Sequence, residues 1–262
     1  MDLGVKGKTA LITGASKGIG RGVAESLAAE GCNLRLAARS GDMLETAAAE
    51  LRDAYGVTVA VHACDITAPG VIDELAAAGI PDILVNNAGA IPAGDIEAMV
   101  EERWRDAWEL KVFGYINMTR TFFAAMKQRG HGVICNVTGL AADKTDFNYV
   151  AGTTGNAGLN AFTKAIGGVS LEFGVRVFAV SPGPVQTERL IGLLKTRAVQ
   201  DGGSEDNWQS YMSGMPMQRA ATVPEVADTV AFLVSDRATY FTGQVVTVDG
   251  GQGSRGGSFT NK

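Results

Sequence analysis

The sequence lacks the features that would place it on a nucleic acid or at a membrane. None of its apolar runs approaches the roughly 18 residues of a membrane span. No cluster of Lys and Arg is present, and the formal net charge is -5, which argues against a nucleic-acid footprint or an anionic membrane surface. The start, MDLGVKGKTALITG, enters an expected strand directly and offers no signal peptide. We therefore expect a cytoplasmic protein whose partners are small molecules.

Cysteine and histidine are also scarce. Cys32, Cys64 and Cys135 are odd in number, lie inside apolar runs and lack the spacing of metal ligands. They are predicted to be buried, inert thiols, and no disulfide or metal site is expected. His62 and His131 fall outside every motif described below and are expected to be structural.

The order of sequence patterns predicts one α/β domain spanning residues 1–262. Composition does not change along the chain and no internal repeat is visible. Short β-branched runs alternate with helical stretches, as in a parallel sheet covered on both faces. The fold class is thus a doubly wound, Rossmann-type sheet of seven strands. The expected strands lie near residues 8–13, 33–38, 57–63, 82–86, 132–137, 175–180 and 245–248, and expected crossover helices include 21–30, 41–55 and 102–128.

Two segments depart from this alternation. Residues 187–222 contain Gly202-Gly203 and several charges and are too long for an ordinary loop, so they are the candidate lid. The lid has apolar residues that would either cover a hydrophobic substrate or pack on the domain: Leu190, Leu193, Leu194, Trp208, Tyr211, Met212, Met215 and Met217. The end, residues 252–262, is polar and Gly-rich and is expected to be flexible.

A glycine-rich motif follows the first expected strand. In TGASKGIG, Gly14, Gly18 and Gly20 open a helix, where glycines allow a tight turn and the helix N-terminus offers free N–H groups to a pyrophosphate. Three more motifs follow later strands: CDIT with Asp65, VNNAG with Asn86, Asn87 and Gly89, and SPGPVQT. The carboxyl ends of such strands are where an open α/β sheet binds its ligand.

With these motifs the chain resembles the short-chain dehydrogenase/reductase family from about Lys6 to Gly251. The quoted marks are TGASKGIG, NNAG, PGPVQT and the ending TGQVVTVDGG at 242–251. The resemblance implies that Asp65 holds the adenine amino group, that Asn87 stabilises the central strand and that Thr187 bonds the nicotinamide carboxamide. The expected cofactor-binding residues are Gly14, Ser16, Lys17, Gly18, Ile19, Gly20, Arg39, Ser40, Asp65, Ile66, Asn87, Ala88, Gly89, Pro182, Gly183, Val185 and Thr187.

The resemblance also implies a homotetramer or homodimer. Its subunits would associate through the long helices 102–128 and 152–173, with Gly155 or Gly158 permitting close backbone approach.

The end of the second strand favours NADP(H) over NAD(H). In LRLAARSGD, Arg39 and Ser40 stand where an NAD-preferring chain usually places a carboxylate for the ribose hydroxyls. A guanidinium suits a 2′-phosphate, and Lys17 in the glycine loop adds a second cation. The alternative is that both are solvated surface charges.

All four residues of the family's usual catalytic set are predicted to be replaced. The resemblance implies an Asn on a long helix, a Ser after the fifth strand, and a Tyr and a Lys four residues apart at the start of the next helix. Counting back from Thr163 in LNAFTK places Asn156 at the Lys position and Gly152 at the Tyr position. The same spacing places Gly139 at the Ser position, and WELKVFG places Lys111 at the Asn position.

Several interpretations of this replacement stay open. Lys111 stands at the family's Asn position and Asn156 at its Lys position, so the site would keep an ammonium and an amide if the two positions face each other. Thr138 is a further candidate for a catalytic residue. Tyr149 as the catalytic tyrosine would add nearly a helical turn before LNAFTK and leave Thr153 at the Lys position. Neutral drift in a dead site is another interpretation. The loop residues Asp143, Lys144 and Asp146 could enter the site or form a solvated face.

The sequence thus favours an NADP(H)-dependent oxidoreductase acting on a bulky or apolar carbonyl or alcohol substrate by a non-standard mechanism. The alternatives are a non-redox lyase or isomerase using the same pocket, and a non-catalytic NADP-binding sensor or partner subunit.

Overall fold

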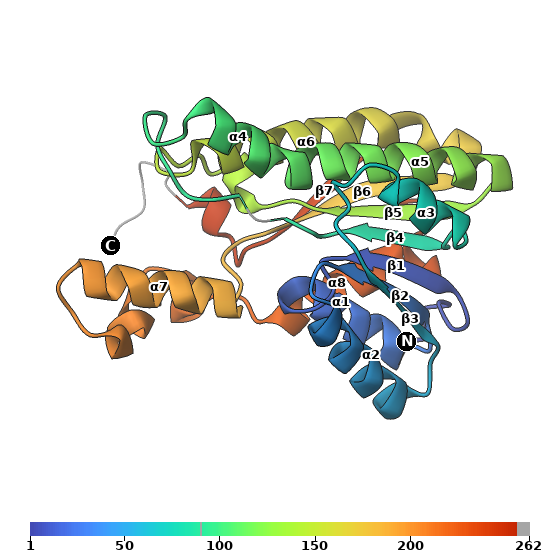
Figure 1. The fold of residues 1–262 in the computed structure, drawn as a ribbon, viewed down its shortest axis with the longest axis horizontal. Helices are drawn as coiled ribbons and strands as arrows, with labels where there is room; N and C mark the ends of the chain where they lie inside the picture. The colour runs from blue at the N-terminus through green and yellow to red at the C-terminus, as the bar shows by residue number, and fades with distance from the viewer. Residues whose placement is uncertain (90, 256–262) are drawn as a thin grey trace.

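A single parallel sheet organises the chain (Figure 1). The structure, a computed structural model, describes residues 1–89 and 91–255. Seven strands pair in the order β3-β2-β1-β4-β5-β6-β7, and every pairing is parallel. The strands are β1 (Thr9–Thr13), β2 (Asn33–Ala38), β3 (Val59–Ala63), β4 (Ile83–Asn86), β5 (Gly132–Val137), β6 (Val175–Pro182) and β7 (Val245–Val248). The predicted seven-stranded, doubly wound fold is confirmed, with each strand within two residues of its expected bounds.

Helices cover both faces of this sheet. In Figure 1, α1 (Gly18–Ala29), α2 (Gly41–Tyr55) and α8 (Val223–Val234) lie on one side. The other side carries α3 (Val71–Ala77), α4 (Glu101–Trp108), α5 (Gly114–Arg129) and α6 (Val150–Ser170). Short 3₁₀ turns occupy Leu140–Ala142, Leu171–Phe173, Asp236–Ala238 and Gln252–Ser254. None of the helices in the described ranges is long and apolar enough to cross a membrane.

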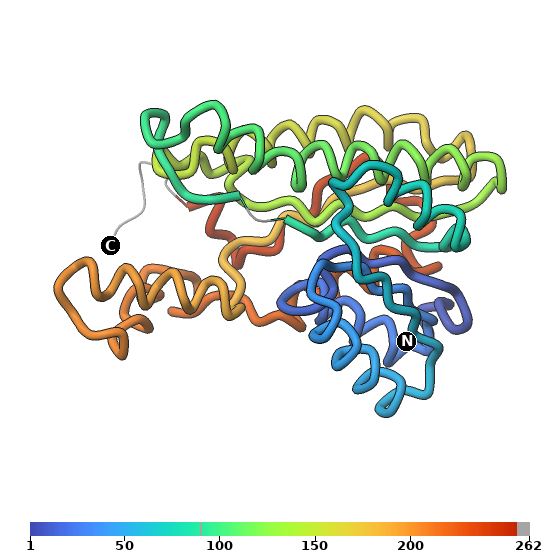
Figure 2. The backbone as a smooth tube through the Cα atoms, in the orientation of Figure 1, coloured from blue at the N-terminus to red at the C-terminus, as the bar shows by residue number. Residues whose placement is uncertain are grey.

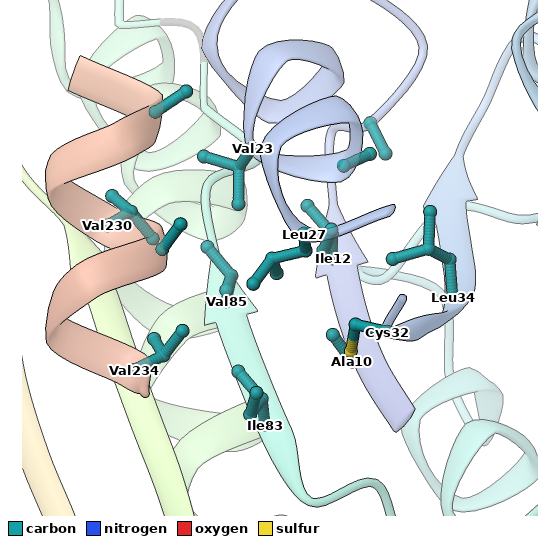
Figure 3. Packing of buried hydrophobic residues seen from close by; sticks show 14 of the residues in the cluster. Ala10, Ile12, Val23, Leu27, Cys32, Leu34, Ile83, Val85, Val230 and Val234 are labelled. Atoms are coloured by element: carbon teal, nitrogen blue, oxygen red, sulfur yellow. The ribbon is translucent and has the colours of Figure 1, made fainter. Parts of the chain in front are cut away.

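The core beneath α1 and α8 fixes the strands that carry the cofactor motifs. Figure 3 shows Val23 and Leu27 of α1, with Val230 of α8, directed at Ile12 and Val85 of the two central strands. All five side chains are fully buried, and each such burial contributes roughly 1.5–3 kcal/mol. The carboxyl ends of β1 and β4 are therefore held at a fixed spacing.

The helix expected over residues 102–128 is interrupted at its centre. A π-helical turn, η1 (Glu109–Phe113), separates α4 from α5, and the Gly114 N–H donates to the Glu109 carbonyl. Single π turns inside α-helices widen the helix locally and occur at functional sites. Lys111 lies within this turn.

The candidate lid forms an arm beside the sheet (Figure 2). It consists of α7 (Glu188–Gln200), a 3₁₀ helix η4 (Glu205–Met212) and a turn η5 (Pro216–Gln218). Met212 is buried, whereas Leu193 and Met217 are exposed. Its function as a lid stays a prediction.

Two other expectations concern glycines and the chain end. A Cβ at Gly155 would lie 3.1 Å from Val112 and 3.2 Å from the Trp108 indole. Gly155 therefore faces its own chain, and the expectation that it permits subunit contact is wrong. A Cβ on Gly158 would meet no atom of the described residues within 4 Å, so Gly158 still suits that role. Of the expected flexible tail 252–262, residues 252–254 form a 3₁₀ turn, and residues 256–262 lie outside the described part.

Candidate active site

One large cleft opens at the carboxyl ends of the strands. Its volume is about 1280 Å³, and it collects residues from both halves of the chain. Of the predicted site residues, the cleft is lined by Gly14, Ser16, Lys17, Gly18, Ile19, Arg39, Ser40, Asp65, Ile66, Asn87, Ala88, Gly89, Lys111, Thr138, Gly139, Asn156, Pro182, Gly183 and Thr187. Gly20, Gly152 and Val185 do not line it. Val185 is buried in the core, where it pairs with Ala221.

The glycine loop forms a cradle that fits a dinucleotide pyrophosphate. Gly14 has φ +67°, and a Cβ there would lie 2.9 Å from the Ala88 Cα. A Cβ on Gly20 would lie 2.4 Å from the Asn87 side chain, so Gly20 supports the loop from one layer below. Among the described residues, no side chain caps the start of α1 at Lys17. The first N–H groups of this helix are thus free for an anion.

Asn87 and Asp65 define the rims of this cradle. The Asn87 side chain donates to the Thr13 carbonyl at 3.0 Å and the Gly14 carbonyl at 3.3 Å, which ties β4 to β1 as the family resemblance implies. The Asp65 carboxylate accepts from the Thr67 N–H at 3.0 Å and the Thr67 hydroxyl at 2.8 Å. The Thr67 backbone hydrogen bond is the main cause that lowers the pKa of Asp65, and the Arg39 charge adds to it.

The two cations expected near the cofactor differ in their surroundings. Arg39 is exposed at the edge of the cleft, next to Ser40. The Lys17 ammonium lies 3.9 Å from the Glu188 carboxylate of α7. Glu188 was not identified from the sequence, because no motif marks the first residue of the arm.

Lys111 is buried at the inner end of the cleft. Its ammonium donates to the Val137 carbonyl at 2.7 Å and to the Tyr115 hydroxyl at 3.1 Å. The Tyr115 hydroxyl donates in turn to the same carbonyl at 3.1 Å. A Cβ on Gly89 would lie 2.5 Å from the Lys111 Cδ, so the side chain passes directly over that glycine.

The surroundings of Lys111 disfavour its charge. Burial lowers the pKa of Lys111 to about 7, and the positive charge of Arg189 acts in the same direction. No carboxylate of the described residues opposes these two effects. Both effects favour the neutral amine over the ammonium.

Asn156 lies beside Gly139 on the cleft wall. Its amide donates to the Gly152 carbonyl at 2.8 Å, and its buried Oδ1 has no protein partner among the described residues. A Cβ on Gly139 would lie 3.4 Å from the Asn156 amide. Lys111 and Asn156 line the same cleft, but no hydrogen bond joins them within the described ranges. Thr138 is buried, and within the described part of the chain its hydroxyl donates one long hydrogen bond, of 3.5 Å, to the Val180 carbonyl.

Tyr149 occupies the space above Gly152. It lies at the start of α6, and a Cβ on Gly152 would lie 2.0 Å from the Tyr149 Cε1. The ring thus covers Gly152, which explains why this glycine does not line the cleft, and Tyr149 lines it instead. Burial raises the pKa of Tyr149, and Arg189 opposes that change.

Arg189 is the main residue that sequence reasoning missed. It belongs to the first turn of α7, lines the cleft and donates to the Ile91 carbonyl at 2.8 Å.

Of the charged loop before α6, Lys144 and Asp146 line the cleft and Asp143 does not. None of the eight apolar residues expected on the lid lines it. Cys64 lines it too and is only partly buried, unlike Cys32 and Cys135, although burial still raises the pKa of its thiol.

Comparison with known proteins decides the family. A family model described as enoyl-(acyl carrier protein) reductase matches residues 14–252. The 3-oxoacyl-(acyl-carrier-protein) reductase of Escherichia coli is 34% identical over 254 residues, covering 94% of this chain and 97% of that protein. The chain belongs to the short-chain dehydrogenase/reductase family.

Solved structures of family members agree with the fold. L-Sorbose reductase from Gluconobacter frateurii, complexed with NADPH and L-sorbose, has a TM-score of 0.90 at 34% identity, with 95% of this chain and 98% of that chain covered. A 7α-hydroxysteroid dehydrogenase complexed with NADH has a TM-score of 0.83 at 27% identity, with 95% and 96% covered. Members of this family related to the chain therefore include proteins solved with either nicotinamide cofactor. The replacement of the usual catalytic residues in this member stays a prediction.

Proposed function

We propose that the chain is an NADP(H)-dependent oxidoreductase acting on a carbonyl or alcohol substrate with an apolar body. The observation that carries this proposal is the continuity of one cleft, which runs from the glycine loop to Lys111. Beyond the cofactor residues the walls include Ile91, Leu110, Leu140 and Phe147. Apolar walls with few polar groups suit a largely apolar ligand whose reacting atom is fixed by those groups.

The cofactor would be held by cleft-lining residues at the ends of strands and at the starts of helices. The free N–H groups of the α1 start suit the pyrophosphate, Asp65 suits the adenine amino group, and Thr187 suits the carboxamide. Arg39 supports the choice of NADP(H), because a guanidinium pairs well with a 2′-phosphate. Bound nicotinamide supplies or accepts a hydride. The chain's own residues must then orient the substrate and balance the charge on its oxygen.

Lys111 is the group that would stabilise that oxygen. Two of its three donor positions are used by Val137 and Tyr115, and the ammonium of a lysine has three. The third is available for a negatively charged oxygen in the cleft, where low polarity strengthens the interaction. A missing general acid typically costs about 10²–10⁴-fold, whereas orientation of bound reactants contributes an effective molarity of about 10⁵–10⁸ M. Catalysis without the family's tyrosine is therefore feasible.

A Lys111→Met variant tests this role. With a substrate found by screening carbonyl compounds for NADPH oxidation, turnover should fall at least tenfold while the Kd for NADPH changes by less than about threefold. Lys127→Met is the matched control, because Lys127 is an exposed lysine of the following helix α5 and does not line the cleft. Equal turnover in the wild-type protein and the Lys111 variant would remove Lys111 from the mechanism. NADPH binding without oxidation by any carbonyl compound would favour the sensor.

A lyase or isomerase is the second candidate, because Lys111 combines burial, a neighbouring cation and a lowered pKa. Such a lysine suits an amine nucleophile that condenses with a ketone and releases water. Borohydride treatment in the presence of a ketone separates the two functions. A stable adduct on Lys111, seen by mass spectrometry of the digest, would support the lyase or isomerase. Oxidation of NADPH in proportion to product would support the oxidoreductase.

A further inference from the structure

Two cations converge on the substrate end of the cleft from different parts of the chain. Lys111 comes from the π turn η1, and Arg189 comes from the first turn of the arm helix α7. Both line the cleft, and Arg189 is close enough for its charge to act on the Lys111 amine and on the Tyr149 phenol. Arg189 is exposed, and its hydrogen bond to the Ile91 carbonyl at 2.8 Å orients the guanidinium at the cleft.

Protein carboxylates do not neutralise this pair. Asp146 and Glu188 are the cleft-lining carboxylates on the segments nearest the two cations. The Asp146 Oδ1 accepts from the Asn148 N–H at 2.8 Å, and the Glu188 carboxylate lies 3.9 Å from the Lys17 ammonium. Within the described ranges, neither forms an ion pair with Lys111 or Arg189. Of the two cations only Lys111 is buried. A buried cation without an opposite charge is costly, so a ligand anion near Lys111 would restore the balance.

The free bonding capacity of the site points in the same direction. Lys111 donates its two hydrogen bonds to a carbonyl and a phenol, and both of these groups are neutral. The hydrogen bond of Arg189 to Ile91 uses one of the five N–H donors of a guanidinium, and a hydrogen bond with the Tyr149 phenol engages another. These donors suit oxygen atoms, and a planar guanidinium matches a carboxylate in particular. The nearby walls formed by Ile91 and Leu140 are apolar.

We infer that the substrate is a keto acid, or the matching hydroxy acid, whose carboxylate binds Arg189 and whose carbonyl oxygen binds Lys111. This inference rests on the proposed function for the reaction, but the anion site itself can be tested without turnover. An apolar body next to the keto acid would lie against Ile91 and Leu140.

Calorimetry with 2-oxo-4-phenylbutanoate and its ethyl ester tests the carboxylate site. The titrations are made with saturating NADP⁺, which cannot reduce the ketone, so binding is measured without reaction. We expect the acid to bind at least tenfold more tightly than the ester, as for a charge-assisted hydrogen bond. Pyruvate serves as a second, smaller acid in case the phenyl group does not fit.

Arg189→Gln should weaken binding of the acid at least tenfold and leave the ester within about twofold. Arg197→Gln is the matched control on the same helix, because Arg197 is an exposed arginine whose guanidinium lies 3.7 Å from the Asp201 carboxylate and does not line the cleft. Equal affinity for acid and ester, or no binding of either acid at millimolar concentration, would overturn the inference. A weaker Kd for NADP⁺ in Arg189→Gln would also overturn it, because Arg189 would then serve the cofactor. Reduction of the ester as fast as the acid would support the proposed oxidoreductase and refute the keto acid as substrate. Binding of the acid without any turnover would support the anion site and refute the proposed oxidoreductase.

Discussion

Replacing Lys111 by Met should change how the stability of the protein depends on pH. Burial and the Arg189 charge lower the pKa of Lys111 to about 7 in the folded chain, against an ordinary value of 10.5. Between these two values the unfolded chain keeps the proton and the folded chain releases it. The free energy of unfolding therefore rises with pH across this window and is flat, as far as Lys111 is concerned, below pH 7.

The magnitude follows from the two pKa values. Each pH unit inside the window is worth about 1.36 kcal/mol, so the wild-type protein should gain about 2–3 kcal/mol from Lys111 between about pH 7 and pH 9. The Met variant lacks this gain, and all other titrating groups are shared. The difference in unfolding free energy, variant minus wild type, should fall by the same amount over that range.

Urea denaturation followed by circular dichroism, at one protein concentration and a series of pH values, measures this difference. Lys127→Met is the control, and its difference from wild type should not vary with pH. A flat difference curve for Lys111→Met would refute the reasoning, because it would mean that the ammonium is as well solvated in the folded chain as in the unfolded one.

Three further predictions concern the cofactor, the start of α6 and the assembly. Arg39→Leu should raise the Kd for NADP⁺ at least tenfold by calorimetry and leave NAD⁺ unchanged, since a charge-assisted contact of about 1.5–3 kcal/mol is lost; equal losses for both cofactors would contradict the phosphate contact. Gly152→Ala should lower the melting temperature, because its Cβ would lie 2.0 Å from the Tyr149 ring and overpacking costs about 1–3 kcal/mol. Adding Tyr149→Ala should recover part of that loss, and no recovery would show that the ring is not the obstacle. The wild-type protein should sediment as a tetramer or dimer and Gly158→Arg as a smaller species, whereas a wild-type monomer at micromolar concentration would refute this assembly.

The strands and the cofactor loop could be predicted from the sequence because local patterns determine them. Buried parallel strands appear as short β-branched runs, and the glycines at 14 and 20 are required wherever the chain must approach Ala88 or Asn87 closely. The interruption at Glu109–Phe113 could not be predicted, because residues 102–128 have helical spacing on both sides of it. The depth at which Lys111 lies depends on Gly89 and Val137, which come from other parts of the sheet.

The position of Tyr149 shows where counting along a helix fails. Spacing within α6 places position 152, not 149, at the family's tyrosine, and that count assumes that both residues follow the helical period. Tyr149 lies before the first residue of α6 and has φ -143° and ψ 39°, so its ring can fold back across Gly152. The sequence signal for this arrangement was a tyrosine, Tyr149, three residues before the helical glycine Gly152, which leaves space for its ring. Arg189 had no such signal, because its place in the cleft depends on the path of the arm.

The environment of Lys111 also bears on whether the site has lost its catalytic function by neutral drift. A lysine kept in a buried position with no carboxylate beside it lowers stability at neutral pH and below, and replacing it by an apolar residue of similar length would relieve that cost. Function is the usual reason for a protein to retain such a group. If the site is active, Lys111→Met should therefore be more stable than the wild type near pH 6 and less active with the substrate. If the site has decayed, the gain in stability should come with no loss of any measurable property, including the affinity for acids in the presence of NADP⁺. Measuring unfolding and acid binding on the same two proteins separates these cases without an assay of turnover.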